Sequence, residues 1–446
     1  MKKHTLLSLM VSMLLAGCVT VSQAKADNSV KLQNDPVQCE KFMNWGLGMF
    51  IHWSLDSELG SVISHSMVGA SDDYLDRYIN ELPKYFNPQA YDAEEWVKLA
   101  KLAGVRYMVL TTKHHSGFCL WPTKSTDFSI SKTPYKKDIV KQYVDACRKY
   151  DMKVGFYFSP EDFLFLRRQS YEIRRRSKHA DISTNPELLA HNKVQIKELF
   201  SNYGQIDVAF LDAFDNKMIA QYIHQLQPDC LITRGEMITP EQHIPNKPLL
   251  GPWEACFTLG TQWQYKPTNE IYKSGGKLIE MLIDTRAKGG NLLINMGPQP
   301  SGRIPMEQER TFRELALWMF INGESIHDIR PCPLAKEGNL WFTRSVEEKS
   351  TIYVFIPQGK KAWKKGARRQ YTLASLAATE KTRISVLGQN DRVVEYNPNL
   401  KPASKFNQTK DGLHISIVRA QRIYNNFKWP NVVVVKLEGV EFVSEQ

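Results

Sequence analysis

Histidine and aspartate side chains stand at the ends of short apolar runs in this sequence. His114 and His115 follow the run at residues 105–110 through two threonines and a lysine, and Asp212 directly follows residues 206–211. Each run has the length and the β-branched or aromatic content of a buried strand. Titratable groups at the ends of buried strands are placed as catalytic groups are in α/β enzymes, although an aspartate there can also be a helix cap.

The adjacent pair His114 and His115 could form a metal site, recognise a ligand, or only fill a strand end. Neighbouring residues of an extended segment point to opposite faces, so the two rings are poorly placed to bind one zinc ion. We therefore expect no metal here. Hydrogen-bonding rings at the end of a strand suit the recognition of sugar hydroxyl groups better.

The elements around these residues alternate between strands and helices. Predicted strands lie at residues 47–53, 105–110, 153–159, 206–212, 230–233 and 291–295, and predicted helices at 39–45, 92–103, 139–150, 188–203, 218–226, 276–288 and 308–322. This alternation predicts parallel βα units, and their number favours a (β/α)8-like, TIM-type barrel. An open doubly wound sheet is the alternative, but no Gly-x-Gly-x-x-Gly follows the first strand.

In such a barrel the active site collects at the carboxyl ends of the strands. The polar residues that end the predicted strands are His52, His114, His115, Tyr157, Asp212 and Arg234. They lie far apart in the sequence, and the barrel would bring them together.

The pattern changes near residue 340 to short alternating segments, which predict a C-terminal antiparallel β-sandwich. At the other end, Lys2 and Lys3 precede an apolar run at residues 6–15 that is too short to span a membrane. We expect a signal peptide at 1–26, a catalytic barrel at 27–335 and a β-sandwich domain at 336–446.

The signal peptide has two possible cleavage sites. Leu15-Ala16-Gly17-Cys18 resembles a bacterial lipobox with a lipidated Cys18, and a site after Ala24-Lys25-Ala26 competes with it. Either cleavage site predicts export. The lipobox is the favoured alternative, and it predicts a periplasmic or outer-membrane lipoprotein of a bacterium. Membrane contact would then occur only through the lipid.

Composition excludes several classes of protein. The chain has 446 residues, 42% of them hydrophobic, which allows a large core. The six cysteines after Cys18 are scattered without Cys-x-x-Cys spacing, so we expect mostly buried free thiols. The formal net charge is +11, but no nucleic-acid-binding motif accompanies it, and we expect no nucleic-acid partner. For the basic segment at residues 167–178, the favoured interpretation is a solvent-exposed face of the protein.

Several separated motifs resemble glycoside hydrolase family 29, the α-L-fucosidases. They are Lys-His-His-Ser-Gly-Phe at 113–118, Tyr-Gly-Gln-Ile-Asp-Val-Ala-Phe-Leu-Asp at 203–212, and the Gly-Gly-Asn segment at 288–298. The resemblance covers roughly residues 40–330. It implies an exported retaining exo-α-L-fucosidase that acts on fucosylated oligosaccharides or glycoconjugates and needs no cofactor.

The same match implies roles for individual residues. Asp212 would be the nucleophile, although Phe210 and Ala213 replace the Trp and Gly of the family motif. A second carboxyl group with a raised pKa is needed as acid/base. Glu254, beside Trp253, is slightly favoured over Glu241, because an apolar neighbour raises the pKa of a carboxyl group by desolvation. Glu236 is a third, weaker candidate.

The resemblance also implies a sugar pocket. His52, His114 and His115 would hold fucose hydroxyls, and Tyr157, Arg234, Trp121 and Trp263 would line the pocket, with core packing as the alternative for Trp121. Residues 61–67 depart from the family's Glu-Trp-Tyr-like segment, so the resemblance does not predict which glycosidic linkage this protein prefers. A glycosidase for another sugar and an inactive carbohydrate-binding protein are the rival hypotheses. The basic segment could overhang the site and favour sulfated or other anionic glycans.

Overall fold

The computed structural model describes residues 33–359, 363–425 and 428–443. The predicted signal peptide at 1–26 and Cys18 lie outside these residues. Within the described part of the chain, no helix is long and apolar enough to cross a membrane.

The parallel strands between residues 47 and 296 form one sheet of seven strands. Its strands are β1 (Leu47–Ile51), β2 (Tyr107–Lys113), β3 (Lys153–Phe158), β4 (Val208–Leu211), β5 (Leu231–Ile232), β6 (Glu254–Phe257) and β7 (Asn291–Met296). Their order is β5-β4-β3-β2-β1-β7-β6, so the first and the seventh strands are neighbours and the sheet curls. This arrangement confirms the predicted (β/α)8-like fold.

An irregular segment at residues 237–241 lies between β5 and β6. Met237 forms an isolated bridge with Arg234 after β5, while Ile238 and Glu241 form parallel bridges with Trp253 and Cys256. The segment therefore occupies the place of an eighth strand without regular pairing.

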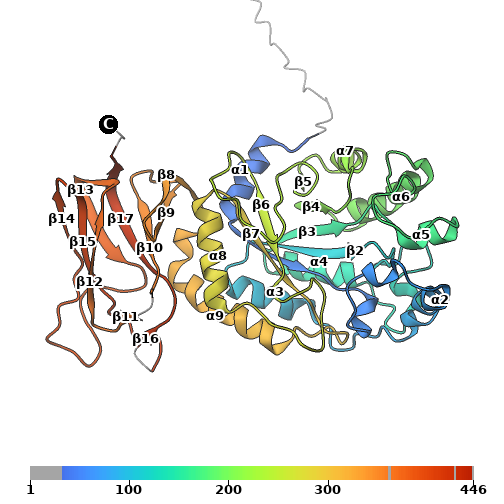
Figure 1. Cartoon of the computed structure of the whole chain (residues 1–446), viewed down its shortest axis with the longest axis horizontal. Helices are drawn as coiled ribbons and strands as arrows, with labels where there is room; N and C mark the ends of the chain where they lie inside the picture. Colours follow the sequence, from blue (N-terminus) through green and yellow to red (C-terminus); the bar gives the residue numbers. More distant parts are fainter. Residues whose placement is uncertain (1–32, 360–362, 426–427, 444–446) are drawn as a thin grey trace, which may run out of the picture. The chain divides into compact units, whose positions relative to one another are not determined.

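Helices follow or precede the parallel strands. They are α1 (Pro36–Trp45), α2 (Asp72–Asn80), α3 (Ala93–Leu102), α4 (Ile139–Lys149), α5 (Phe163–Arg168), α6 (Pro186–Asn202), α7 (Lys217–Leu226), α8 (Gly275–Ala287) and α9 (Met306–Asn322). Figure 1 shows the strands between α6 and α7 on one side and α8 and α9 on the other. Aspartate side chains cap several of these helices; Asp92, for example, accepts from the backbone N–H of Glu94 and Asp138 from that of Lys141.

The strands are buried on both faces, as is usual for a parallel sheet covered by helices. On β2, Met108 and Leu110 belong to the main hydrophobic core, whereas Tyr107 and Val109 pack in a separate cluster of inward-facing side chains. Gly48 makes room for one of them, because a Cβ there would lie 2.4 Å from the ring of Tyr107. Inward-facing side chains thus pack together inside the barrel.

The remaining strands are antiparallel. They are β8 (Ile329–Glu337), β9 (Leu340–Ser345), β10 (Ile352–Ile356), β11 (Trp363–Lys364), β12 (Arg368–Leu373), β13 (Leu376–Val386), β14 (Lys405–Thr409), β15 (Gly412–Val418), β16 (Lys428–Trp429) and β17 (Val433–Phe442). They form sheets β13-β17-β10-β9-β8, β12-β15-β14 and β11-β16. The predicted antiparallel C-terminal region is confirmed, while the boundary at residue 336 stays a prediction; β8 begins before it.

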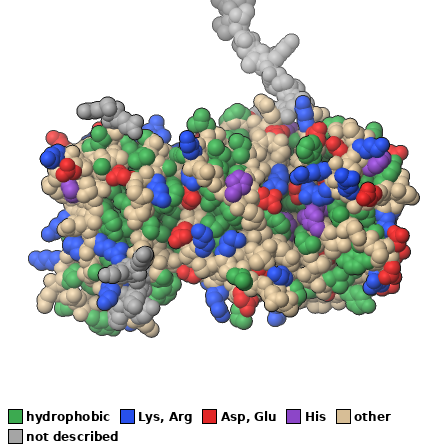
Figure 2. Space-filling view, in the orientation of Figure 1, with side chains coloured by type: hydrophobic (Ala, Val, Ile, Leu, Met, Phe, Trp, Pro, Cys, Tyr) green, Lys and Arg blue, Asp and Glu red, His purple; other side chains and the backbone are tan. Residues whose placement is uncertain are grey.

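Side-chain chemistry agrees with the composition. Of the six cysteines in the described residues, all are free thiols and five are buried, as expected. On the face of the molecule in Figure 2, Lys and Arg side chains are interspersed with acidic and uncharged ones. The positive net charge is thus distributed over this face.

Candidate active site

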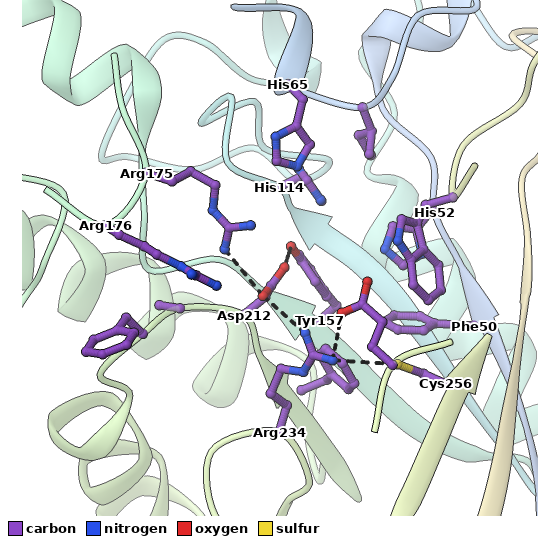
Figure 3. Close-up of a pocket in the computed structure, with 16 residues that line it drawn as sticks. Phe50, His52, His65, His114, Tyr157, Arg175, Arg176, Asp212, Arg234 and Cys256 are labelled. Atoms are coloured by element: carbon purple, nitrogen blue, oxygen red, sulfur yellow. Dashed lines mark hydrogen bonds and ion pairs between the residues drawn. The ribbon is translucent and has the colours of Figure 1, made fainter. Parts of the chain in front are cut away.

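A cavity of about 310 Å³ opens at the carboxyl ends of the parallel strands. Its lining residues come from the strand ends and the loops that follow them: Phe50, His52, Ile63, His65, His114, Tyr157, Arg175, Arg176, Phe210, Asp212, Ala213, Phe214, Arg234, Glu241, Cys256 and Trp263. Figure 3 shows the labelled side chains converging around Asp212. Most residues predicted for the site are therefore brought together.

Asp212 lies directly after β4 and is held from three sides. Tyr157, on β3, donates its hydroxyl to Oδ2 at 2.8 Å. Arg234 Nη1 and Arg175 Nη2 lie 3.4 and 3.6 Å from Oδ1. Behind it, His115 Nε2 is 3.5 Å from Oδ2. Its own backbone N–H donates to Phe158 O, which fixes the residue at the end of the sheet.

The surroundings keep Asp212 ionised. Burial alone raises the pKa of its carboxyl group, but His115, the guanidinium groups of Arg234 and Arg175, and the hydrogen bond from Tyr157 together outweigh burial and hold the pKa well below its usual range. Burial also lowers the pKa of His115 itself well below the usual value. An ionised, positioned carboxylate has the properties of a nucleophile.

Glu241 faces the same part of the cavity. Arg234 Nη2 donates to Glu241 Oε2 at 3.0 Å, while Nη1 of the same guanidinium contacts Asp212. The side chain of Glu241 is 42% exposed, so it is open to solvent and to a ligand. Arg234 therefore contacts both Asp212 and Glu241.

Glu254 occupies a different position. It is the first residue of β6 and pairs with Asn291, the first residue of β7, whereas Cys256, two residues further on, lines the cavity. Its side chain is fully buried and accepts a hydrogen bond from the hydroxyl of Tyr107 at the start of β2. Burial raises the pKa of Glu254 to about 7. The raised pKa expected for this residue is present, but its carboxyl group lies below the cavity.

The histidines form one wall. Nδ1 of His52 donates to Asn295 Oδ1 at 2.6 Å, and burial lowers the pKa of His52 to about 3, so that Nε2 is left as an acceptor. The ring of His114 stacks on Tyr157 at a centroid distance of 5.3 Å. Trp263 stacks on His52 at 4.8 Å. These neutral and aromatic groups suit an uncharged polyhydroxylated ligand.

Two other predicted residues lie elsewhere. Trp121 is buried and does not line the cavity; its indole N–H donates to Glu198 on α6. This position matches the core-packing alternative. Glu236 does not line the cavity either, and its carboxylate contacts His224 at 2.9 Å.

The argument that His114 and His115 point to opposite faces is wrong. The chain turns directly after β2, so the two residues are not extended and their ring centroids lie 4.2 Å apart. Ligand atoms of both histidines and of Asp212 lie within 4.8 Å of one another. Arg175 and Arg234 already neutralise this carboxylate, which disfavours a cation there. The absence of a metal stays a prediction.

Sequence reasoning missed several lining residues. His65 comes from the segment that departs from the family pattern, and its ring lies 5.4 Å from that of His115. Arg175 and Arg176 belong to the basic segment for which a solvated face was favoured. Arg175 is instead half-buried between Glu161 and Asp212. The signal available was a run of arginines shortly after a strand end; nothing in their spacing indicates which of them turn inward.

A cavity that presents two carboxylates at the strand ends of a parallel barrel is the active-site arrangement of a glycoside hydrolase. The family model "Alpha-L-fucosidase" matches residues 15–324. The chain belongs to the alpha-L-fucosidase family.

Individual alpha-L-fucosidases are also similar to this chain in sequence. Plasma alpha-L-fucosidase of Rattus norvegicus is 27% identical over 355 residues, which is 69% of this chain and 75% of that protein. The human plasma enzyme is 26% identical over 359 residues, 69% of this chain and 74% of that protein.

Solved structures with the same fold include alpha-L-fucosidase isoenzyme 1 from Paenibacillus thiaminolyticus, with a TM-score of 0.72 and 26% identity over 90% of this chain and 99% of that one. A GH29 alpha-L-fucosidase from Bacteroides thetaiotaomicron, a trapped covalent intermediate in complex with 2-fluoro-fucosyl fluoride, has a TM-score of 0.69 and 22% identity over 92% of this chain and 97% of that one.

Proposed function

We propose that this protein is a retaining exo-α-L-fucosidase that releases terminal α-L-fucose from glycans. The observation that carries the proposal is the contact of one guanidinium, that of Arg234, with both Asp212 and Glu241 in a single cavity. Family membership supports the sugar, and the trapped intermediate of the Bacteroides relative supports the covalent route.

The first step forms a glycosyl ester. An oxygen of the ionised Asp212 attacks the anomeric carbon while the bond from that carbon to the leaving oxygen breaks, and Glu241 gives its proton to the leaving oxygen. Glu241 is proposed in place of Glu254, because it lines the cavity and Glu254 does not. Arg234 and Arg175 stabilise the carboxylate before attack.

The second step hydrolyses the glycosyl ester and regenerates the free enzyme. Water attacks the anomeric carbon of the ester, Glu241 accepts its proton, and the bond to Asp212 breaks, so that the sugar leaves with its configuration retained. The neutral His52 and His114 and the ring of Trp263 would hold the sugar in both steps. No step requires a metal or an organic cofactor.

One observation favours a second candidate, a glycosidase of the same fold with another sugar preference. Phe210 lines the cavity where the family motif has a Trp, and His65 comes from a segment that departs from that pattern. Comparison of kcat/KM for a panel of aryl glycosides separates the two, since a fucosidase cleaves the α-L-fucoside fastest.

The test is release of nitrophenol from an aryl α-L-fucoside by the wild type and by Asp212→Ala with and without azide. We expect turnover by the wild type, loss of at least about 10³-fold in the variant, and formation of β-fucosyl azide when azide is added. Asp145→Ala, at an exposed ion pair on α4, is the matched control. A wild type that binds fucose without turnover would instead identify a carbohydrate-binding protein.

We further propose that the protein is exported as a bacterial lipoprotein, periplasmic or on the outer membrane, with its lipid on Cys18. The lipobox-like segment at residues 15–18 and the preceding apolar run support this. Membrane fractionation of cells that express wild type or Cys18→Ala tests it. The variant should move to the soluble fraction, and unchanged membrane association contradicts the proposal.

A further inference from the structure

Two consecutive arginines reach the cavity from the loop between α5 and α6. Arg175 and Arg176 both line it, and Figure 3 shows both side chains extending toward Asp212. Arg175 already pairs with Asp212, whereas the proposed reaction steps give Arg176 no role, so the presence of this second arginine needs a separate explanation.

A buried carboxylate holds this loop in place. Glu161 Oε2 accepts from Arg175 Nε at 2.5 Å, and Oε1 accepts from the backbone N–H of Arg176 at 3.3 Å. Glu161 is only 2% exposed. Arg176 also has a φ of 58°, a region that non-glycine residues rarely adopt. The backbone at Arg176 is therefore fixed in an unfavourable conformation at the edge of the cavity, as is typical of functional positions.

The two arginines differ in their partners. Arg175 is shared between Glu161 and Asp212. In the same basic segment, Arg167 pairs with Asp72 and Asp76, and Arg168 pairs with Asp127. Arg176 is exposed, and its guanidinium forms no ion pair or hydrogen bond with any side chain of the described residues. It is thus a cation at the cavity edge with its donors available.

An apolar side chain accompanies it. Phe214 lines the same cavity and is 78% exposed. An exposed aromatic ring and a guanidinium fork together can bind a sugar ring that bears an anionic group, because the ring packs on the sugar face and the fork pairs with a sulfate or carboxylate.

We propose that Arg176, supported by Arg175 and Phe214, binds an anionic substituent, a sulfate ester or a carboxylate, on the saccharide that leaves when the glycosidic bond is cleaved. The inference rests on the proposed fucosidase function and names its substrate class. The neutral His52 and His114 with Trp263 take the uncharged sugar, and the exposed Arg176 takes the charged neighbour.

The test uses a matched set of α-L-fucosyl disaccharides, in each available linkage, with galactose, galactose 6-sulfate or galacturonic acid at the reducing end. Fucose release gives kcat/KM for the wild type, Arg176→Gln, Arg176→Lys and the control Arg174→Gln. Arg174 is the neighbouring exposed arginine and does not line this cavity. The sulfate and the carboxylate arms distinguish the two sources of negative charge.

We expect the wild type to prefer at least one anionic disaccharide over the neutral one by about tenfold, and the preference to fall as ionic strength rises from about 0.05 to 0.5 M. Arg176→Gln should reduce the ratio to near one, Arg176→Lys should keep part of it because a lysine retains the charge without the fork, and Arg174→Gln should keep all of it.

Other outcomes overturn the inference. If the wild type hydrolyses the aryl fucoside but does not prefer an anionic disaccharide, the anion-binding role of Arg176 is refuted and the proposed fucosidase function stands. The same conclusion follows if the preference for the anionic disaccharide survives in Arg176→Gln. A wild type that hydrolyses no fucoside of any kind refutes the proposed function, and this inference with it.

Discussion

Replacing Glu254 by Gln tests whether this residue is a buried structural acid or a catalytic one. Glu254 is fully buried at the start of β6, accepts the hydroxyl of Tyr107, and has a pKa raised by burial to about 7. Gln has nearly the same shape and still accepts that hydrogen bond. The substitution therefore removes the titration of this group and little else.

The expected effect on stability follows from proton linkage. Glu254 has a pKa of about 7 in the folded protein and an ordinary value of 4.5 when unfolded, so between these pH values the folded state binds more protons. The contribution of Glu254 to the free energy of unfolding consequently falls as the pH rises from 4.5 to about 7, and this contribution changes no further above it. At 1.36 kcal/mol per pKa unit, the loss is about 3 kcal/mol. Glu254→Gln lacks this loss.

Urea unfolding of both proteins, followed by tryptophan fluorescence between pH 4.5 and 8, measures the effect. We expect the variant to gain about 3 kcal/mol relative to the wild type across this interval, and its kcat/KM to stay within about threefold. Glu241→Gln, the matched substitution in the cavity, should lower kcat/KM by about 10² to 10⁴-fold. A stability difference that is independent of pH refutes the argument from burial, and loss of turnover in Glu254→Gln with turnover kept in Glu241→Gln reverses the proposed roles.

Further substitutions test the rest of the site. Arg234→Lys should lower kcat/KM by about 10²-fold in the aryl fucoside assay with little change in thermal unfolding, because a single ammonium group does not reproduce two contacts made by one planar fork. Trp263→Ala should raise KM about tenfold because it removes the ring stacked on His52, whereas Trp121→Phe should leave KM unchanged and cost about 1 kcal/mol of stability through one lost hydrogen bond. His52→Gln should reduce the loss of stability on acidification from pH 6.5 toward 3 in urea unfolding, because only the unfolded wild type binds a proton at this histidine in that range.

The barrel and the residues at its strand ends could be predicted because both follow from local sequence patterns. Each apolar run that ends in a polar group, such as the run before Asp212, formed a buried strand with that group at its carboxyl end. The choice between Glu254 and Glu241 depended on a strand that was not recognised. Glu254 precedes the apolar residues of β6 instead of following them, so it lies at the opposite end of its strand from the cavity.

Contacts between distant loops could not be predicted. Arg175 turns inward because Glu161 is buried next to it after β3, and the sequence alone does not show that the two side chains meet. The same holds for His65, which reaches His114 and His115 from a loop without strand or helix periodicity. Such residues are specified by tertiary packing, so their roles become visible only in three dimensions.

The irregular segment at residues 237–241 has a consequence for how this catalytic site can change. Asp212 follows a strand whose register is fixed by pairing with β3 and β5, so an insertion or deletion there would displace a whole row of inward-facing side chains. The backbone of Glu241 is paired through an isolated bridge with Cys256 and not within a regular strand, so a change of length beside it disturbs no regular ladder. Evolution and protein engineering can thus vary the position of the proposed proton donor, and the leaving groups it would serve, while the proposed nucleophile stays in place.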